Sequence, residues 1–206
     1  MVREAYKFAI PVLLVGGACL VFGWKWPAGI FFLLGLFVFY FFRDPDRRIP
    51  AGPGVVVAPA DGRVVEVVEE EFGNVAGHRI SIFLSLWDVH VQRAPFAGRI
   101  AKIEYRPGKF YGAYRAAASR ENEQNVIYIN TPTGKMIVKQ IAGAIARRVL
   151  CWKHEGDELA RGERVGMIRF GSRVDLWLPS GAEIQVRKGQ FAKGGETVVA
   201  KWNSTT

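Results

Sequence analysis

Two uncharged runs near the N-terminus dominate the hydrophobic pattern of this chain. Residues 8–23 and residues 28–42 carry no charge, and the stretch FFLLGLFVFYFF in the second run has no polar face at any helical spacing. As helices, these runs would each cover about 24 Å, slightly less than the ~30 Å hydrocarbon core of a bilayer. The connecting WKWP supplies aromatic residues suited to the headgroup level, and Pro27 discourages one continuous helix. We therefore predict a helical membrane hairpin over residues 1–42.

Charges at the two ends of the hairpin predict its orientation, because basic residues favour the cytoplasmic side of a membrane. Basic residues lie outside both apolar runs, at Arg3, Lys7, Arg43, Arg47 and Arg48, whereas the connection contains only Lys25. Both ends are therefore expected in the cytoplasm, with the rest of the chain on that side of the cell membrane. A cleaved signal peptide would explain only the first run, and a helix packed on the surface of a soluble fold would retain a polar face.

The pattern changes to short alternating segments after a linker rich in Pro, Gly and charge at residues 43–54. Strand pairs are predicted around the PADG turn in GVVVAPADGRVVEVVEE and within NVIYINTPTGKMIVKQIAGAIARRVL, and single strands in HRISIFLSL and GRIAKIEYRPG. One short helix is expected in GAYRAAASRENEQ. Residues 55–206 should thus form a mainly β domain with few short helices.

An internal echo in the last third of the chain refines this fold class. EGDELARGERVGMI and RKGQFAKGGETVVA each place a glycine seven residues before a glutamate, Gly156 with Glu163 and Gly189 with Glu196. Each segment is typical of a strand, an exposed turn and a returning strand. Paired hairpins of this kind resemble the barrel-sandwich domains of the lipoyl and biotinyl carriers, although no tip lysine has the flanking motif that a swinging arm needs. The resemblance therefore concerns architecture only.

Net charge and cysteine usage narrow the class of partner. Residues 43–206 carry a net charge of +7, which favours the anionic cytoplasmic leaflet, and no nucleic-acid-binding motif or dense Lys/Arg tract is present. Cys19 and Cys151 form neither a disulfide framework nor a metal-type spacing. The expected partners are a membrane and a lipid, with no nucleic acid and no metal.

Three separate segments contain candidate catalytic residues with ordinary alternatives. His90 lies in LSLWDVHVQRAPFAG, where Asp88 could hold one tautomer for acid–base work, although a lone histidine in a β protein is more often structural. Asp61 in PADG suits a turn in any case. The polar residues of SRENEQN could be a solvated helix end or a polar wall of a site; they are Glu121, Asn122, Glu123 and Asn125.

Ser172 offers a different chemistry because Gly171 precedes it between two strand-like runs, in GMIRFGSRVDLWLP. A tight turn is the simple interpretation. Alternatively, Gly171 tolerates backbone angles that direct the serine hydroxyl at the preceding carbonyl, and a strained, polarised amide there could be converted to an ester. Elimination and hydrolysis would then leave a pyruvoyl group at residue 172.

Together with RFGSRVDLWLP, the stretches PADGRV, WDVHVQRAP, SRENEQN and GDELARGERVGMI closely resemble the short prokaryotic branch of the phosphatidylserine decarboxylase family. The resemblance runs from about residue 43 to the C-terminus. It implies self-cleavage between Gly171 and Ser172 into a β chain, residues 1–171, and an α chain, residues 172–206, which remain associated. The cofactor is then the pyruvoyl group at Ser172, which forms a Schiff base with phosphatidylserine, without metal or pyridoxal phosphate.

By the same resemblance, His90 is the proton donor that completes phosphatidylethanolamine after carbon dioxide leaves. The longer branch of the family has a second histidine where this chain has Arg93, so its Ser-His-Asp relay for self-cleavage cannot be transferred intact. Asp61 is assigned to processing, and Arg93 and Asp88 to substrate binding, with Arg93 suited to a carboxylate or phosphate. A homo-oligomer is compatible with the sequence.

Two other functions compete with this hypothesis. A non-enzymatic, membrane-anchored adaptor with a lipoyl-like barrel would share the architecture, but such adaptors usually insert a long helical hairpin that this sequence lacks. A soluble pyruvoyl enzyme acting on a free amino acid would not need residues 8–42. The sequence leaves open whether the lipid is ester-linked or ether-linked.

Overall fold

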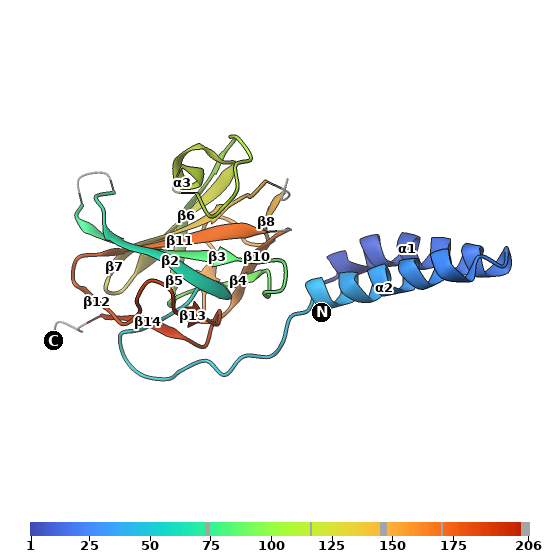
Figure 1. Ribbon diagram of the computed structural model, residues 1–206. Coiled ribbons are helices and arrows are strands. Elements are labelled where there is room, and N and C mark those ends of the chain that lie inside the picture. Colours follow the sequence, from blue (N-terminus) through green and yellow to red (C-terminus); the bar gives the residue numbers. More distant parts are fainter. Residues whose placement is uncertain (73–74, 116, 145–147, 170, 203–206) are drawn as a thin grey trace. The chain divides into compact units, whose positions relative to one another are not determined.

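A computed structural model describes residues 1–72, 75–115, 117–144, 148–169 and 171–202 (Figure 1). The chain divides into two compact units, Met1–Asp46 and Arg47–Thr206. The first unit contains the predicted pair of apolar helices. The second unit contains the predicted β domain.

Helices α1, Glu4–Val21, and α2, Lys25–Phe41, form the first unit, and Pro27 lies in the first turn of α2, where proline is tolerated. The two helices pack closely, because a Cβ added at Gly35 would lie 2.6 Å from Leu13. Helix α1 is long and apolar enough to cross a membrane, α2 is slightly shorter, and only 22% of the apolar window of α1 is buried. A core helix of a soluble protein would be mostly buried, so this exposure supports membrane association.

Within its described residues, the second unit is mainly β, as predicted. Its one α-helix there is α3, Ala118–Glu121, inside the segment where a short helix was expected. The strands are β1 Val55–Val57, β2 Gly62–Glu69, β3 Gly77–Leu84, β4 Val91–Arg93, β5 Gly98–Arg106, β6 Gln124–Thr131, β7 Gly134–Ile141, β8 Val149–Cys151, β9 Glu158–Leu159, β10 Arg164–Ile168, β11 Ser172–Pro179, β12 Ala182–Ile184, β13 Phe191–Ala192 and β14 Val198–Trp202.

The strands form one large curled antiparallel sheet and two small sheets (Figure 1). The large sheet has the order β13-β2-β3-β11-β7-β6-β5-β9, and the small sheets have the orders β1-β14-β12 and β4-β10-β8. Alternate residues of the central strands face one apolar core that includes Ile82, Val138, Val174 and Leu176. The strands on either side of the PADG turn belong to different sheets: β1 pairs with β14, and β2 pairs with β3.

The internal echo of the sequence is a repeated structure. Strand β9 pairs with β5 at one edge of the large sheet, and β13 pairs with β2 at the other. The equivalent glycines Gly156 and Gly189 have φ of 90° and 91°, and Gly162 and Gly195 both have φ of 79°. Strands β10 and β14 are in turn the central strands of the two small sheets. The two echoed segments thus occupy comparable places at opposite edges of the large sheet, as the echo in the sequence predicts.

Candidate active site

The candidate cleavage bond lies at the start of β11, a central strand of the large sheet. Ser172 lies opposite Leu84 of β3, and Arg173 pairs with Ile141 of β7 on the other side. Gly171 just precedes the strand with φ of +68°, in the left-handed region that favours glycine. The chain therefore turns sharply at Gly171 and enters a strand that is hydrogen-bonded on both edges.

The hydroxyl group of Ser172 is buried without a hydrogen-bond partner among the described residues. Burial of an unpaired hydroxyl costs about 1–3 kcal/mol in proteins, so native structures seldom contain one without a reason. The buried, unpaired hydroxyl therefore makes Ser172 a candidate reactive group.

His90 is fully buried beside the same bond, immediately before β4. The main-chain N–H of Gly171 donates to His90 Nε2 over 3.3 Å, and His90 Nδ1 lies 2.9 Å from the carbonyl oxygen of Asp88. Because Nε2 accepts a hydrogen bond here, this arrangement fits the neutral tautomer whose Nδ1–H donates to the carbonyl oxygen of Asp88. Two residues from different parts of the sequence, His90 and Gly171, are thus in direct contact.

The carboxylate of Asp88 does not perform the orienting task that the sequence suggested for it. Its Oδ2 accepts hydrogen bonds from the main-chain N–H and the hydroxyl group of Ser85, each 2.7 Å long. The main-chain carbonyl of Asp88 contacts His90 instead. The two-residue spacing predicted the correct neighbour but the wrong group, because the chain turns between Ser85 and Asp88 and is not extended there.

The carboxylate of Asp61 is buried and is surrounded by hydrogen-bond donors. Arg47 Nη2 lies 2.9 and 3.0 Å from its two carboxylate oxygens, and the N–H of Gly194 donates to Oδ1 over 2.8 Å. Burial raises the pKa of Asp61, and the charge and hydrogen bonds of its partners offset this only in part. The next residue, Gly62, lies against the main chain of Phe83, so Asp61 belongs to the same end of the sheet as Ser172.

Arg93 lies next to the Asp61 turn. Its main-chain N–H donates to the carbonyl of Pro59 over 2.8 Å, and its Nη1 donates to the carbonyl of Gly162 over 3.0 Å. The side chain is almost fully buried. The structure thus bonds the main chain of Arg93 to Pro59, two residues before Asp61, and brings His90 into contact with Gly171, the residue before Ser172.

A buried polar cluster follows Ser172 on the opposite face of β11, and the sequence reasoning missed it. Arg173 bonds Asp175 over 2.6 Å, Ser81 over 2.7 Å and Glu66 over 3.0 Å, and Ser119 also donates to Asp175. Burial alone would raise the pKa of Glu66, but hydrogen bonds and charge from Arg79 and Arg173 lower it. The sequence signal for this cluster was the alternation of Arg173 and Asp175 with apolar residues. In a central strand, such a polar face must find its partners inside the protein.

Asn122 and Gly143 are two further residues near the cleavage bond. Asn122 is 1% exposed and bonds the main chain on two segments, which agrees with a polar wall and not with a solvated helix end. Gly143 lies against the carbonyl oxygen of Gly171. Nothing in the sequence AGA marks Gly143, because its importance comes from a contact between distant segments.

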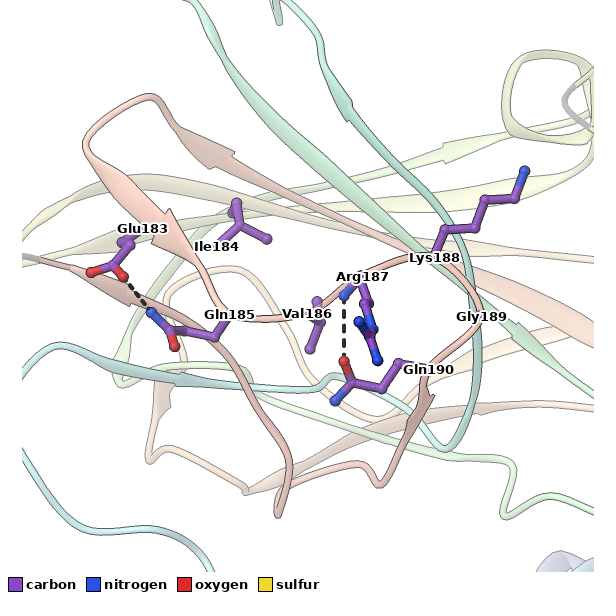
Figure 2. A pocket seen from close by; sticks show the side chains of 8 residues that line it. All are labelled: Glu183, Ile184, Gln185, Val186, Arg187, Lys188, Gly189 and Gln190. Atoms are coloured by element: carbon purple, nitrogen blue, oxygen red, sulfur yellow. Dashed lines mark hydrogen bonds between the residues drawn. The ribbon is translucent and has the colours of Figure 1, made fainter.

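Two cavities of the domain lie away from the candidate site. One of about 820 Å³ is lined only by residues 183–190, where Figure 2 shows Gln185 bonded to Glu183 and Gln190 bonded to Arg187. Another, about 710 Å³ and mainly apolar, includes Trp177 and Pro179 near the far end of β11. None of the candidate residues lines either cavity, so the site is defined by the buried contacts around Ser172.

Sequence comparison identifies the family to which the chain belongs. The sequence profile described as "Phosphatidylserine decarboxylase" matches residues 34–200. The chain is 46% identical over 209 aligned residues to the "Phosphatidylserine decarboxylase proenzyme" of Burkholderia cenocepacia, with 97% of this chain and 94% of that protein covered. The matched range of the profile contains the positions of the candidate residues around Ser172. The chain therefore belongs to the phosphatidylserine decarboxylase family of enzymes.

Proposed function

We propose that this enzyme converts phosphatidylserine to phosphatidylethanolamine and carbon dioxide with a pyruvoyl group made from its own Ser172. The observation that carries the proposal is the buried Ser172 hydroxyl, which has no hydrogen-bond partner in the described part of the chain, next to Gly171, whose φ is +68°. Family membership supports the reaction class, and membership of a family of enzymes removes the support for a non-enzymatic adaptor.

Self-cleavage would begin with Ser172 and the bond before it. The Oγ atom forms a bond to the carbonyl carbon of Gly171, the C–N bond breaks, and the hydroxyl proton moves to the nitrogen, which leaves an ester. Loss of the Cα proton expels the carboxylate of Gly171 and leaves dehydroalanine at residue 172. Tautomerisation and addition of one water release one ammonia and leave the ketone. Ser172 Oγ thus becomes the second oxygen of the Gly171 carboxylate, and water supplies the oxygen of the new ketone.

Once formed, the pyruvoyl group supplies an electron-withdrawing carbonyl that accepts the electron pair left by departing carbon dioxide. His90 is the proposed proton donor to the former serine α carbon. In the uncut chain its Nε2 lone pair is occupied by the N–H of Gly171. After cleavage Gly171 is a chain end, and its departure would free Nε2 to take up and deliver a proton.

The remaining candidates are assigned supporting roles. Asp61, held by Arg47 and Gly194, would fix the turn beside the cleavage site during processing. The side chains of Arg93 and Asp88 bond to protein groups, which gives less support for direct headgroup binding. We propose that both shape the wall of the substrate site around His90.

The α and β chains are expected to remain associated after the cut. Strand β11, Ser172–Pro179, pairs with β3 and β7, which both come from the β chain. Arg173 and Asp175 add buried contacts to Ser81, Glu66 and Ser119. Removal of one partner from such a buried ionic cluster typically costs about 3–5 kcal/mol, so separation of β11 from the β chain would be strongly unfavourable.

Intact-mass measurement of the purified wild-type protein tests the proposal. The expected products are residues 1–171 with a free carboxylate and residues 172–206 lighter, by one ammonia, than the product of simple hydrolysis. Treatment with cyanoborohydride and phosphatidylserine should add the lipid covalently to the shorter chain. A fully active preparation that consists of the intact 206-residue chain would contradict the proposal.

We also propose that residues 1–42 anchor the enzyme in the cell membrane, with residues 43–54 as linker and residues 55–206 on the cytoplasmic side. When vesicles that contain phosphatidylserine are floated in a density gradient, most of the protein without residues 1–42 should not float with them. The reason is that α1 and α2 carry the apolar surface that would enter the bilayer. Cleavage, measured by mass in the same samples, should be retained. Unchanged flotation of the deleted form would contradict the anchor.

A further inference from the structure

The end of β7 runs directly beside the candidate cleavage bond. Ile141 pairs with Arg173, and the two residues that follow Ile141 continue along the chain next to Ser172 and Gly171. A Cβ atom added at Gly143 would lie 2.1 Å from the carbonyl oxygen of Gly171 and 3.1 Å from its carbonyl carbon. The carbonyl that the serine must attack therefore rests against the main chain of Gly143.

Gly143 is required here for space. Real Cβ atoms do not approach main-chain oxygen within 3.0 Å, so any other residue at position 143 would push the Gly171 carbonyl aside or move β7. Gly171 itself has open space where its own Cβ would be. The close contact thus constrains the position of the carbonyl group of Gly171 from the side of residue 143.

Asn122 fixes the segment that carries Gly143. Its Nδ2 donates to the carbonyl oxygens of Ala142 and Tyr111, over 2.7 and 2.8 Å, and its Oδ1 accepts the N–H of Tyr111 over 3.0 Å. The N–H of Ala142 donates to the carbonyl of Glu123 over 2.9 Å. Both main-chain groups of Ala142, the residue before Gly143, are therefore bonded to the Asn122 segment.

We propose that Asn122 and Gly143 are positioning residues for self-cleavage, holding the Gly171 carbonyl where Ser172 Oγ can attack it. The inference rests on the self-cleavage proposed above. Attack requires an approach of roughly 3–3.5 Å with aligned orbitals, and a misplacement of about 1 Å can cost about 100-fold in rate. Neither residue reacts: Asn122 acts through Ala142, and Gly143 acts by allowing the carbonyl to remain close.

The first test compares Gly143→Ala with Gly181→Ala, a control glycine whose added Cβ meets no atom within 4 Å. Freshly purified precursor is followed by intact mass, with and without hydroxylamine, which cuts an accumulated ester after Gly171. Gly143→Ala should cleave about 100-fold more slowly than Gly181→Ala and resist hydroxylamine, because ester formation itself is blocked. Cleavage at the control rate, or rapid cutting by hydroxylamine, would overturn the inference.

The second test uses Asn122→Asp, which preserves side-chain size and keeps the positioning argument testable if Gly143→Ala does not fold. Two carbonyl oxygens face Nδ2, so a carboxyl group there can donate only when protonated. Its cleavage rate, relative to wild type in the same buffers, should fall as pH rises, while its melting temperature still shows a folded protein. A pH-independent ratio near one would overturn the inference.

The wild-type sample in each experiment separates this inference from the proposed function. A wild-type chain that never cleaves would remove the self-cleavage proposal itself. If the wild type, Gly143→Ala and Asn122→Asp all cleave at the same rate, only the positioning role is contradicted.

Discussion

Replacement of Ser172 with alanine is expected to leave one uncut 206-residue chain with no measurable decarboxylation of phosphatidylserine. The methyl group cannot attack the Gly171 carbonyl, so neither the ester nor the pyruvoyl group can form. Because enzymes of this kind depend on their electron-accepting group, the loss of turnover should be at least about 10⁶-fold. Folding should persist, since Ser172 Oγ makes no hydrogen bond to the described residues that alanine would lose.

Ser180→Ala provides a matched control for this experiment, because Ser180 follows the other end of the same strand and is exposed. It should cleave and turn over like the wild type. Intact mass and release of carbon dioxide from carboxyl-labelled lipid are measured on the same samples. Normal carbon dioxide release by an uncut Ser172→Ala chain would show that residue 172 is not the source of the cofactor.

Most of the fold could be predicted because local patterns and global topology agree. The segments whose apolar residues alternate, HRISIFLSL and GRIAKIEYRPG, correspond to β3 and β5 of the large sheet. The echo between Gly156 and Gly189 predicted two similar segments, since a left-handed turn needs glycine at the same point of each segment. The division of β1 and β2 between two sheets was not predictable, because the PADG turn looks the same in either arrangement.

The site was predictable only where a residue type is chemically distinctive. Ser172, Gly171 and His90 were singled out by type and context, and the structure brings them together. Asn122 was left between two interpretations, because an asparagine that bonds the main chain has the same local sequence as one in solvent. Gly143 gave no signal, since its role depends on a tertiary contact with Gly171.

The Arg173 cluster was missed for a further reason. An alternating strand with Arg and Asp on one face normally has that face in solvent. Here the face is covered, and Arg173 and Asp175 are each 1% exposed. Ser119, from the helix α3 segment, donates to Asp175, so the covering segment also supplies partners. Such a pairing across 56 positions of sequence cannot be inferred from either segment alone.

Replacement of His90 with glutamine is expected to reduce turnover much more than self-cleavage. Turnover should fall by about 100-fold or more, in line with the loss of a general acid. Self-cleavage should change by less than about tenfold, because in the uncut chain the Nε2 lone pair of His90 already accepts the N–H of Gly171. A group whose lone pair is occupied in this way is poorly placed to remove the proton of Ser172.

Three measurements make this division of labour falsifiable. The rate of chain cleavage is followed by intact mass, kcat is measured on the fully cleaved fraction, and the pH profile of kcat is compared with that of His154→Gln, a control whose side chain is 88% exposed. The wild type and His154→Gln should share a pH limb that His90→Gln lacks, because glutamine does not titrate. Equal losses of cleavage and turnover, with the pH limb retained, would assign His90 to processing and require another proton donor for the lipid. Loss of turnover alone, together with loss of the limb, would place His90 at the substrate's α carbon, because a residue that merely packs against Gly171 would not change the titration of the reaction.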